Sequence, residues 1–229
     1  MKFIVIEGLD GSGKSTQLKM LKNYLEQNNI IYEYLHFPRT DSRIYGDLIS
    51  RFLRGELGDI NSVNPYLIAL IYAGDRNDAK DMITNWLSEN KLVIVDRYVY
   101  SNIAFQCAKL KSDKEKVKLS QWIKDLEYNY FNLPRPDLNI FLNVPFEFTK
   151  HNLSKQRTGD DRDYLNGKED IHEKNIDFQN EVRNVYLEEA KNDRHLKIIH
   201  CADKNGHMPE QEVIFNKLIG LLKEQKIIE

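Results

Sequence analysis

A glycine-rich segment near the amino terminus has the composition of a phosphate-binding loop. Residues 8–15 read Gly-Leu-Asp-Gly-Ser-Gly-Lys-Ser and fit the pattern Gly-x-x-x-x-Gly-Lys-[Ser/Thr]. Glycines let the backbone turn so that successive N–H groups point into one hollow, and a following helix adds the positive end of its dipole. Lys14 is placed to reach the β- and γ-phosphates of a nucleotide, and the Ser15 hydroxyl to ligate Mg²⁺. The predicted nucleotide phosphate site comprises Gly8, Asp10, Gly11, Ser12, Gly13, Lys14, Ser15 and Thr16.

An acidic residue and an arginine follow the apolar run Leu92–Val95. An acid at the carboxyl end of a strand beside the phosphate loop is where Mg²⁺ or its waters are held, so Ser15 and Asp96 are the expected metal ligands. Arg97 adds a second fixed cation, which suits the gripping of another phosphate and is less typical of a motor ATPase or a GTPase. Asp96 and Arg97 together therefore predict a cleft in which two phosphoryl groups meet.

Strands and helices, which differ in the spacing of their apolar residues, must position these side chains. Five short runs, rich in β-branched and aromatic residues, predict buried parallel strands at Phe3–Ile6, Tyr32–Phe37, Leu92–Val95, Leu138–Val144 and Leu196–Ile199. The second run is more polar than the others. Between and after the runs, apolar residues recur at helical spacing: Leu18, Leu21 and Leu25; Leu67, Leu70 and Ile71; Met82, Ile83, Trp86 and Leu87; Phe178, Val182, Val185 and Tyr186; Ile214, Leu218, Leu221 and Leu222.

This alternation of strands and helices predicts the α/β class. We expect a P-loop NTPase-type fold, with a sheet of about five parallel strands and helices on both faces. The chain has 229 residues and no linker-like segment, which predicts a single domain over residues 1–229. Bound nucleotides should lie at the carboxyl ends of the strands.

Charge and composition exclude several classes of protein. The 33 Lys and Arg residues nearly balance 35 Asp and Glu, so a partner bound by bulk charge, such as nucleic acid or an anionic membrane, is not indicated. The longest apolar stretch, Tyr66 to Ala73, is too short to span a bilayer. The two cysteines do not suggest a disulfide framework, and the amino terminus does not resemble a signal peptide. We expect a cytoplasmic protein whose histidines lie at the surface or at caps.

Segments spread over essentially the whole chain resemble thymidylate kinase, a family of P-loop nucleoside monophosphate kinases. The phosphate loop and the Asp-Arg pair occur in many nucleotide kinases, whereas the Tyr-x-x-x-Arg and Ser-Asn-x-x-Phe segments are more discriminating. The matching segments are 3–16, 37–39, 72–76, 96–98, 101–105, 136–137 and 170–173, with the polar segment between the last two. The resemblance implies phosphorylation of dTMP to dTDP by ATP with Mg²⁺ as cofactor, for dTTP biosynthesis.

The resemblance also implies roles around the acceptor phosphate. Arg39 and Arg97 would hold the 5′-phosphate of dTMP, next to Phe37. Many relatives insert a Glu before the first of these arginines and this chain does not, so Arg43 is the alternative to Arg39. Asp10 resembles the carboxylate that takes the deoxyribose 3′-hydroxyl. The family pattern makes Lys14, Arg97, Arg157 and Asp10 the expected catalytic set.

For the base and sugar, the implied residues come from two segments and a later tyrosine. Tyr72 and Arg76 are four apart and share a helix face; Tyr72 would stack on the pyrimidine and Arg76 donate to O4, an edge that cytosine presents as an amine. Asn102 suits the N3–H and O4 edge of thymine. Phe105 would close the sugar pocket against a 2′-hydroxyl, and Tyr164 resembles a family aromatic near sugar and base.

The polar segment Ser154–Asp170 is nearly free of aliphatic residues and predicts a mobile surface loop, the lid of the family. Its arginines, Arg157 and Arg162, are the available transition-state cations, acting like an arginine finger in cis. Some relatives carry an arginine in the phosphate loop where this chain has Gly11, which favours Arg157. The family is typically dimeric through helices, and the segment 64–90 is the candidate surface for a homodimer.

Two other functions remain to be separated from this one. A deoxynucleoside kinase shares the phosphate loop and an Asp-Arg pair, but it phosphorylates a hydroxyl and does not need the extra arginines for an acceptor phosphate. A GTP switch module needs an Asn-Lys-x-Asp guanine reader, which this sequence lacks.

Overall fold

The computed structural model describes the chain except residues 1, 61, 155–163, 166, 169 and 174. Its sheet has five strands, all parallel, in the order β2-β3-β1-β4-β5. The strands are β1 (Lys2–Glu7), β2 (Tyr32–His36), β3 (Leu92–Asp96), β4 (Leu138–Asn143) and β5 (Leu196–His200). The expected α/β class and the five expected strands are therefore confirmed.

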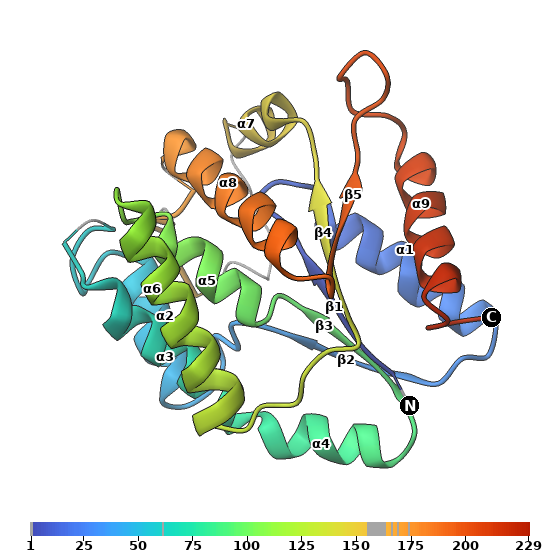
Figure 1. Ribbon diagram of the computed structural model, residues 1–229, viewed down its shortest axis with the longest axis horizontal. Coiled ribbons are helices and arrows are strands. Elements are labelled where there is room, and N and C mark those ends of the chain that lie inside the picture. Colours follow the sequence, from blue (N-terminus) through green and yellow to red (C-terminus); the bar gives the residue numbers. More distant parts are fainter. Residues whose placement is uncertain (1, 61, 155–163, 166, 169, 174) are drawn as a thin grey trace.

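Helices cover both faces of this sheet (Figure 1). One face carries α1 and α9, and the other carries α3, α5, α6 and α8. The described helices are α1 (Lys14–Gln27), α2 (Tyr45–Leu53), α3 (Pro65–Asp78), α4 (Lys80–Ser88), α5 (Val99–Cys107), α6 (Asp113–Lys124), the π-helical turn η1 (Asp125–Tyr130), α7 (Phe146–Ser154), α8 (Ile176–Asn192) and α9 (Gln211–Glu224).

The alternation of side chains along each strand divides the core into two layers. On one face Ile4 and Ile6 of β1 pack in the same cluster as Leu21 of α1 and Leu218 of α9. On the other face Val5 belongs to a cluster built from α3 to α6 and α8. β1 therefore supplies both layers, and it leads directly into the phosphate loop.

The more polar second run forms an edge of the sheet. β2 pairs with β3 alone, and most of its side chains are half-buried. An edge strand has one neighbour and needs less apolar surface than a central strand, which explains why Tyr32 and Glu33 occur in it.

The helix predicted from Leu67, Leu70 and Ile71 is present as α3 (Pro65–Asp78), but two residues of the stripe lie on its exposed side. α3 contains Leu67 and Leu70, but these side chains are 59% and 43% exposed, while Ile68 and Ala69 are buried. α2 and α5 pack on the opposite side of α3 and select the smaller residues there: a methyl group at Gly74 would lie 2.2 Å from the Tyr45 ring.

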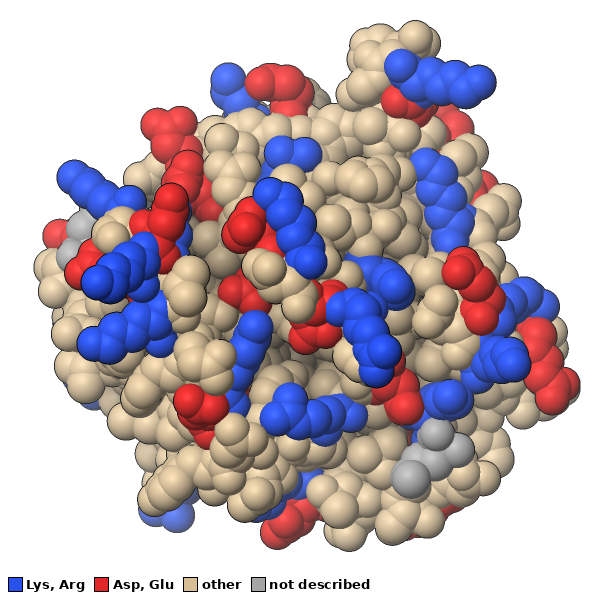
Figure 2. Space-filling view, viewed as in Figure 1, with Lys and Arg blue, Asp and Glu red and all other residues tan. Residues whose placement is uncertain are grey.

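Parallel pairing of β1 with β3 brings the two chemistry-bearing segments together. Ile6 pairs with Asp96, and the N–H of Arg97 donates to the Ile6 carbonyl at 3.0 Å. The phosphate loop and the Asp96-Arg97 pair consequently leave the same edge of the sheet as neighbours. Figure 2 shows acidic and basic side chains interspersed over the face of the molecule that it draws.

Cys107 and Cys201 are both free and buried. Over the residues that the structure describes, no helix combines the length and the apolar character that a bilayer crossing requires.

Gly46 of α2 is predicted to be essential for the packing of the loop that follows β2. A methyl group there would meet the carbonyl oxygens of Arg39 at 2.5 Å and Thr40 at 2.7 Å, and backbone atoms cannot rotate away. Gly46→Ala should lower the free energy of unfolding by about 1–3 kcal/mol, measured by urea denaturation.

Gly220 of α9 is the matched control, because nothing lies within 4 Å of its added methyl group. Gly220→Ala should leave stability unchanged or raise it by up to about 1 kcal/mol through helix propensity. Equal effects of the two substitutions would contradict the steric argument.

Candidate active site

A cavity of about 420 Å³ lies at the carboxyl ends of β1, β2 and β3. It is closed on its sides by α3, α5 and the segment before α8. Its lining residues are Asp10, Lys14, Ser15, Tyr34, His36, Phe37, Pro38, Thr40, Leu53, Tyr72, Arg76, Asp96, Arg97, Ser101, Asn102, Phe105, Gln106, Tyr164, Asp170, His172 and Glu173. A cavity of this volume suits a nucleotide-sized ligand.

The phosphate loop has the backbone that an anion site needs. Gly11 and Gly13 have φ angles of +72° and +77°, a region that favours glycine, and Gly13 caps the amino terminus of α1. The first N–H groups of that helix have no intrahelical partner and face an anion with the positive end of the dipole. Ser12 has a buried hydroxyl without a hydrogen-bond partner.

α7 lies against the outer side of this loop. Asn152 donates its side-chain N–H to the carbonyl of Gly11 at 2.8 Å. A methyl group at Gly11 would be 3.3 Å from both Asn152 and Leu153. A side chain at position 11 would press on both neighbours, and the positive φ there also favours glycine.

Lys14 and Asp96 form a buried ion pair at the mouth of the loop. Asp96 also contacts Nδ1 of His36 at 3.1 Å and the Tyr34 hydroxyl at 3.4 Å. Burial by itself would raise the pKa of Asp96, but Lys14 and His36 outweigh it and hold that pKa well below its ordinary value. Asp96 is therefore a carboxylate at neutral pH.

Oxygen ligands suitable for Mg²⁺ line the same cavity. The Ser15 hydroxyl and the Asp96 carboxylate are both hard donors, and Mg²⁺ prefers one or two such groups together with waters and nucleotide phosphates. No group of three or more His, Cys, Asp or Glu side chains is arranged as a metal site within the described part of the chain. Ser15 and Asp96 fit an ion that takes its other ligands from water and nucleotide phosphates.

Arg97 is held in the cavity from two sides. Its Nη2 donates to Asp10 at 2.7 Å and its Nη1 to the Ser101 hydroxyl at 3.3 Å. Burial raises the pKa of Asp10, but Arg97 and the amide of Gln179 at 2.9 Å more than reverse the effect, so the pKa is lowered. The backbone of Arg97 has a φ of +66°, an uncommon value for a residue with a side chain.

Glu7 fixes the start of α5 behind Arg97. Its carboxyl accepts from the N–H groups of Tyr98 and Ser101 at 3.0 and 3.3 Å, and from the hydroxyls of Ser101 and Tyr186 at 2.6 and 2.8 Å. The carboxyl is fully buried, and burial raises its pKa. Four donors on one buried carboxyl make this junction rigid, and Arg97 is the residue just before it.

Three predicted base-contacting residues also line the cavity, from α3 and α5. Arg76 is 2% exposed and forms a two-point ion pair with Glu127, at 2.5 and 2.7 Å. The Asn102 amide donates to Glu127 at 2.9 Å and to the Ala69 carbonyl at 3.0 Å. Tyr72 shares the cavity lining with both.

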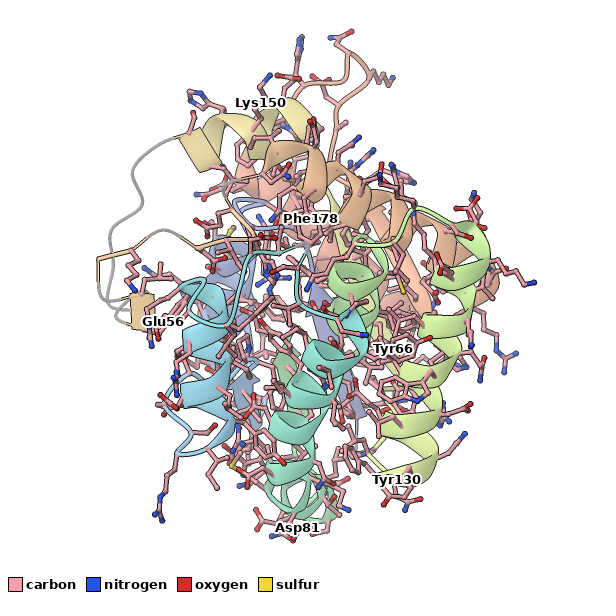
Figure 3. The ribbon with its side chains drawn as sticks, turned by 90° about the vertical axis from the view of Figure 1, so that its left-hand side faces the viewer. Glu56, Tyr66, Asp81, Tyr130, Lys150 and Phe178 are labelled. Carbon is pink, nitrogen blue, oxygen red and sulfur yellow. The ribbon has the colours of Figure 1, made fainter. Side chains whose placement is uncertain are left out.

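Aromatic rings, including those of Phe105 and His172, form part of the cavity lining. The ring of Phe105 lies 5.0 Å from that of His172, which stacks on Phe178 at 5.5 Å. Figure 3 labels Phe178 above α2 and α3 in that view. Tyr164, also predicted for the site, donates its hydroxyl to Asp170 at 3.0 Å.

The expectation of surface or capping histidines is wrong for His172. Its side chain is buried among the rings of Phe52, Phe105 and Phe178. Burial, with a smaller effect of Lys109, lowers the pKa of His172 to about 3, so the ring is neutral at physiological pH. Its Nε2 is buried without a hydrogen-bond partner in the described structure.

The remaining predicted arginines come from the loop after β2 and from the polar segment. Arg39 does not line the cavity; it bonds Asp75 through Nε at 2.9 Å and Asp78 through Nη2 at 2.5 Å. Arg43 is exposed and does not line the cavity either. Arg157 and Arg162 lie outside the described residues. In the described part of the polar segment, Leu165 and Asp170 are buried, so these positions are not surface loop as expected.

Glu127, Gln179 and His172 are among the residues around the site that sequence reasoning missed. Glu127 had a signal, because it follows Leu119 and Ile123 at helical spacing and is therefore a charge on an apolar stripe. Gln179 adjoins Phe178 on another stripe. His172 had no comparable signal, because its aromatic neighbours come from three separate elements.

Comparison with known proteins identifies the group to which this architecture belongs. A family model described as thymidylate kinase matches residues 6–211. The chain is 34% identical to a thymidylate kinase of Plasmodium falciparum, over 86% of this chain and 81% of the relative. It is also 34% identical to a probable thymidylate kinase of Pyrococcus horikoshii, over 96% of this chain and 98% of the relative.

A solved structure shares the fold. The thymidylate kinase of Candida albicans superposes with a TM-score of 0.71 and covers 98% of this chain and 92% of its own, at 23% identity. Five parallel strands with helices on both faces are thus common to the two chains.

Asp170 should give the ligand-free protein a distinctive pH dependence. Burial, reinforced by Asp10, raises the pKa of Asp170 from 3.8 to about 7. The folded protein then keeps a proton that the unfolded chain releases near pH 4, so the stabilisation is complete below pH 4 and is lost as pH rises to 7.

Asp170→Asn removes this titration. The parent should lose stability relative to the variant as pH rises. The free energy of unfolding of the variant minus that of the parent should therefore increase by roughly 2–3 kcal/mol between pH 5 and pH 8. Urea denaturation at closely spaced pH values measures it, and a difference that stays constant with pH would contradict the raised pKa.

Proposed function

The chain belongs to the thymidylate kinase family, which phosphorylates dTMP to dTDP, and we propose that the cavity at the carboxyl ends of β1 and β3 is where ATP and dTMP meet for this reaction. The observation that carries the proposal is that Lys14 and Arg97 line one cavity from adjacent strand ends. One cation is available to the donor phosphates and the other to the acceptor phosphate. In-line transfer between two anions depends mostly on such positioning and charge neutralisation.

The donor side is assigned to the phosphate loop. The N–H groups from Gly11 to Thr16 and the amino terminus of α1 would hold the β- and γ-phosphates of ATP. Lys14, which pairs with Asp96 in the structure, would turn its ammonium group toward the phosphate oxygens. Ser15 and Asp96 would hold Mg²⁺, which supplies charge neutralisation at the β- and γ-phosphates.

The acceptor side is assigned to Arg97, Tyr72, Arg76, Asn102 and Phe105. Arg97 keeps donors free for the 5′-phosphate beyond those bonded to Asp10 and Ser101. The residues of α3 and α5 would surround the thymine base, and Phe105 the sugar. Asp10 and Tyr164 are proposed to face the deoxyribose. In this conformation Arg39 orders the loop after β2 through Asp75, and its phosphate contact would require a rotation away from that carboxylate.

The balance of charge supports a role for the arginines of the polar segment. The described lining contains three Lys or Arg side chains (Lys14, Arg76 and Arg97) and four Asp or Glu side chains (Asp10, Asp96, Asp170 and Glu173). Two nucleotides would bring several negative charges into this set. Additional positive charge must come from Mg²⁺ and from segments such as the one containing Arg157 and Arg162.

We extend the proposal to a homodimer through the exposed side of α3. Leu67 and Leu70 form an apolar pair there, within the segment 64–90, and Tyr66 packs beside α6 against Trp122 (Figure 3). Sedimentation velocity of the purified protein distinguishes a dimer from a monomer.

A panel of phosphoryl acceptors at fixed Mg²⁺ and ATP tests the function. dTMP should yield ADP and dTDP at the highest kcat/KM, while thymidine should yield no product. Lys14→Met keeps the aliphatic stem and should lower kcat at least about 100-fold with folding intact by circular dichroism. Product from thymidine, or parental turnover in Lys14→Met, would contradict the proposal.

Arg157→Ala should lower kcat at least about 100-fold, as expected for an arginine finger, with little change in either KM. A cation that engages only the transferring group stabilises the transition state more than the ground state. Arg162→Ala is the comparison, because Arg162 is the competing residue. Single-turnover rates would show which arginine acts; parental rates in both variants would exclude the polar segment from catalysis.

A further inference from the structure

Glu127 is a buried carboxylate that no step of the reaction uses. It lies in η1, the π-helical turn that follows α6 and ends at Tyr130, beside α3 (Figure 3). Its side chain is fully buried. A buried charge is costly unless it is paired, and Glu127 is paired with two residues that line the cavity, Arg76 and Asn102.

Arg76 is oriented by this carboxylate. Nε and Nη2 donate to its two oxygens, and this two-point contact fixes the plane of the guanidinium. Nη1 has no hydrogen-bond partner among the described residues, and Arg76 lines the cavity. The unused hydrogen-bonding capacity of Arg76 is therefore donor capacity, directed by Glu127.

Asn102 is oriented by the same carboxylate. Both hydrogens of its Nδ2 are used, one toward Glu127 and the other toward the Ala69 carbonyl. Rotating the amide by half a turn would place Oδ1 against two acceptors, so the orientation is fixed by electrostatics. Oδ1 is buried without a partner, and an unpartnered buried acceptor is unfavourable until a donor reaches it.

We propose that Glu127 is the positioning residue that makes this cavity select a pyrimidine with a 4-oxo group and an N3–H over one with a 4-amino group. The proposal rests on the proposed placement of the acceptor base at Arg76 and Asn102. By holding both side chains, Glu127 presents a donor from Arg76 and an acceptor from Asn102. Thymine offers the complementary O4 and N3–H, whereas cytosine offers an amine and an unprotonated N3.

The chemistry requires a carboxylate at this position. Glu127 accepts from three donors: Nε and Nη2 of Arg76 and Nδ2 of Asn102. A glutamine has the same shape, but its NH₂ group must face at least one of these donors. In either placement the NH₂ group opposes Nε or Nη2 of Arg76, so the two-point contact that fixes the guanidinium is lost. The fixed donor that disfavours the amine of cytosine is lost with it, which removes the discrimination against cytosine.

The test is the ratio of affinities for dTMP and dCMP, measured by isothermal titration calorimetry without ATP. Glu127→Gln should reduce the preference for dTMP at least about tenfold relative to the parent, because a hydrogen-bonding mismatch contributes that order of discrimination. The KM for ATP and the kcat at saturating dTMP should change much less. A simple loss of packing would weaken both ligands alike and leave the ratio unchanged.

Glu127→Asp separates chemistry from shape. Aspartate keeps a carboxylate, which only accepts hydrogen bonds, but its side chain is shorter by one methylene. The affinity for dTMP should therefore fall, while the preference for dTMP over dCMP should be better retained than in Glu127→Gln. Glu189→Gln is the matched control, because Glu189 pairs with Ser120 and Lys124 of α6 at 2.6 and 2.7 Å outside the cavity lining. Its affinities should be parental.

The inference is overturned if Glu127→Gln keeps the ratio of dTMP to dCMP affinity within about threefold of the parent. It is also overturned if Glu127→Asp loses as much of this ratio as Glu127→Gln does. Should Glu127→Gln not fold, unchanged dTMP affinity in Glu127→Asp overturns it as well. These failures differ from a failure of the proposed base site. In that case the parent itself would bind dTMP and dCMP alike, or Arg76→Ala would leave dTMP affinity unchanged.

Discussion

The parallel pairing of β1 with β3 sets the geometry on which the rest of the site depends. In this register Ile6 lies beside Asp96, and the Arg97 N–H continues the ladder to the Ile6 carbonyl. A shift of one residue would turn each strand's side chains to the opposite face and separate the phosphate loop from the Asp-Arg pair. Side chains of β1 enter both hydrophobic layers, so packing on both faces depends on this register.

Around this centre, carboxylates organise the cations. Asp96 pairs with Lys14, Asp10 with Arg97, and Glu127 with Arg76. Each acid keeps a flexible basic side chain in one place in a region of low dielectric, where an unpaired charge would be costly. Glu7 does the same for the backbone at the start of α5. These pairings fix the positions of the cations, and fixed positions favour the stabilisation of charge that develops during transfer.

The sequence was informative wherever the signal is local. The phosphate loop, the five strands and the pair after β3 follow from spacing and from runs of apolar residues, and such patterns do not depend on distant contacts. The same local patterns could not place Arg39, whose guanidinium turns toward Asp75 of a separate helix.

Tertiary contacts decided the remaining positions. His172 is buried because Phe52, Phe105 and Phe178 converge on it from different elements. The stripe through Leu67 predicted a helix correctly, but which side of α3 is covered depends on α2 and α5, and those packings have no sequence signal within α3 itself.

The pairing of basic side chains with carboxylates affects how ligands associate with the protein. Basic and acidic side chains are mixed over the face drawn in Figure 2, the net charge of the chain is −2, and the cations of the cavity are largely neutralised by their own partners. Such a molecule projects little field beyond about one Debye length, roughly 8–10 Å at physiological ionic strength. Nucleotides therefore encounter it by ordinary diffusion without long-range steering, and the association rate constant should depend only weakly on salt. Recognition begins at contact distance, where the fixed donors and acceptors act.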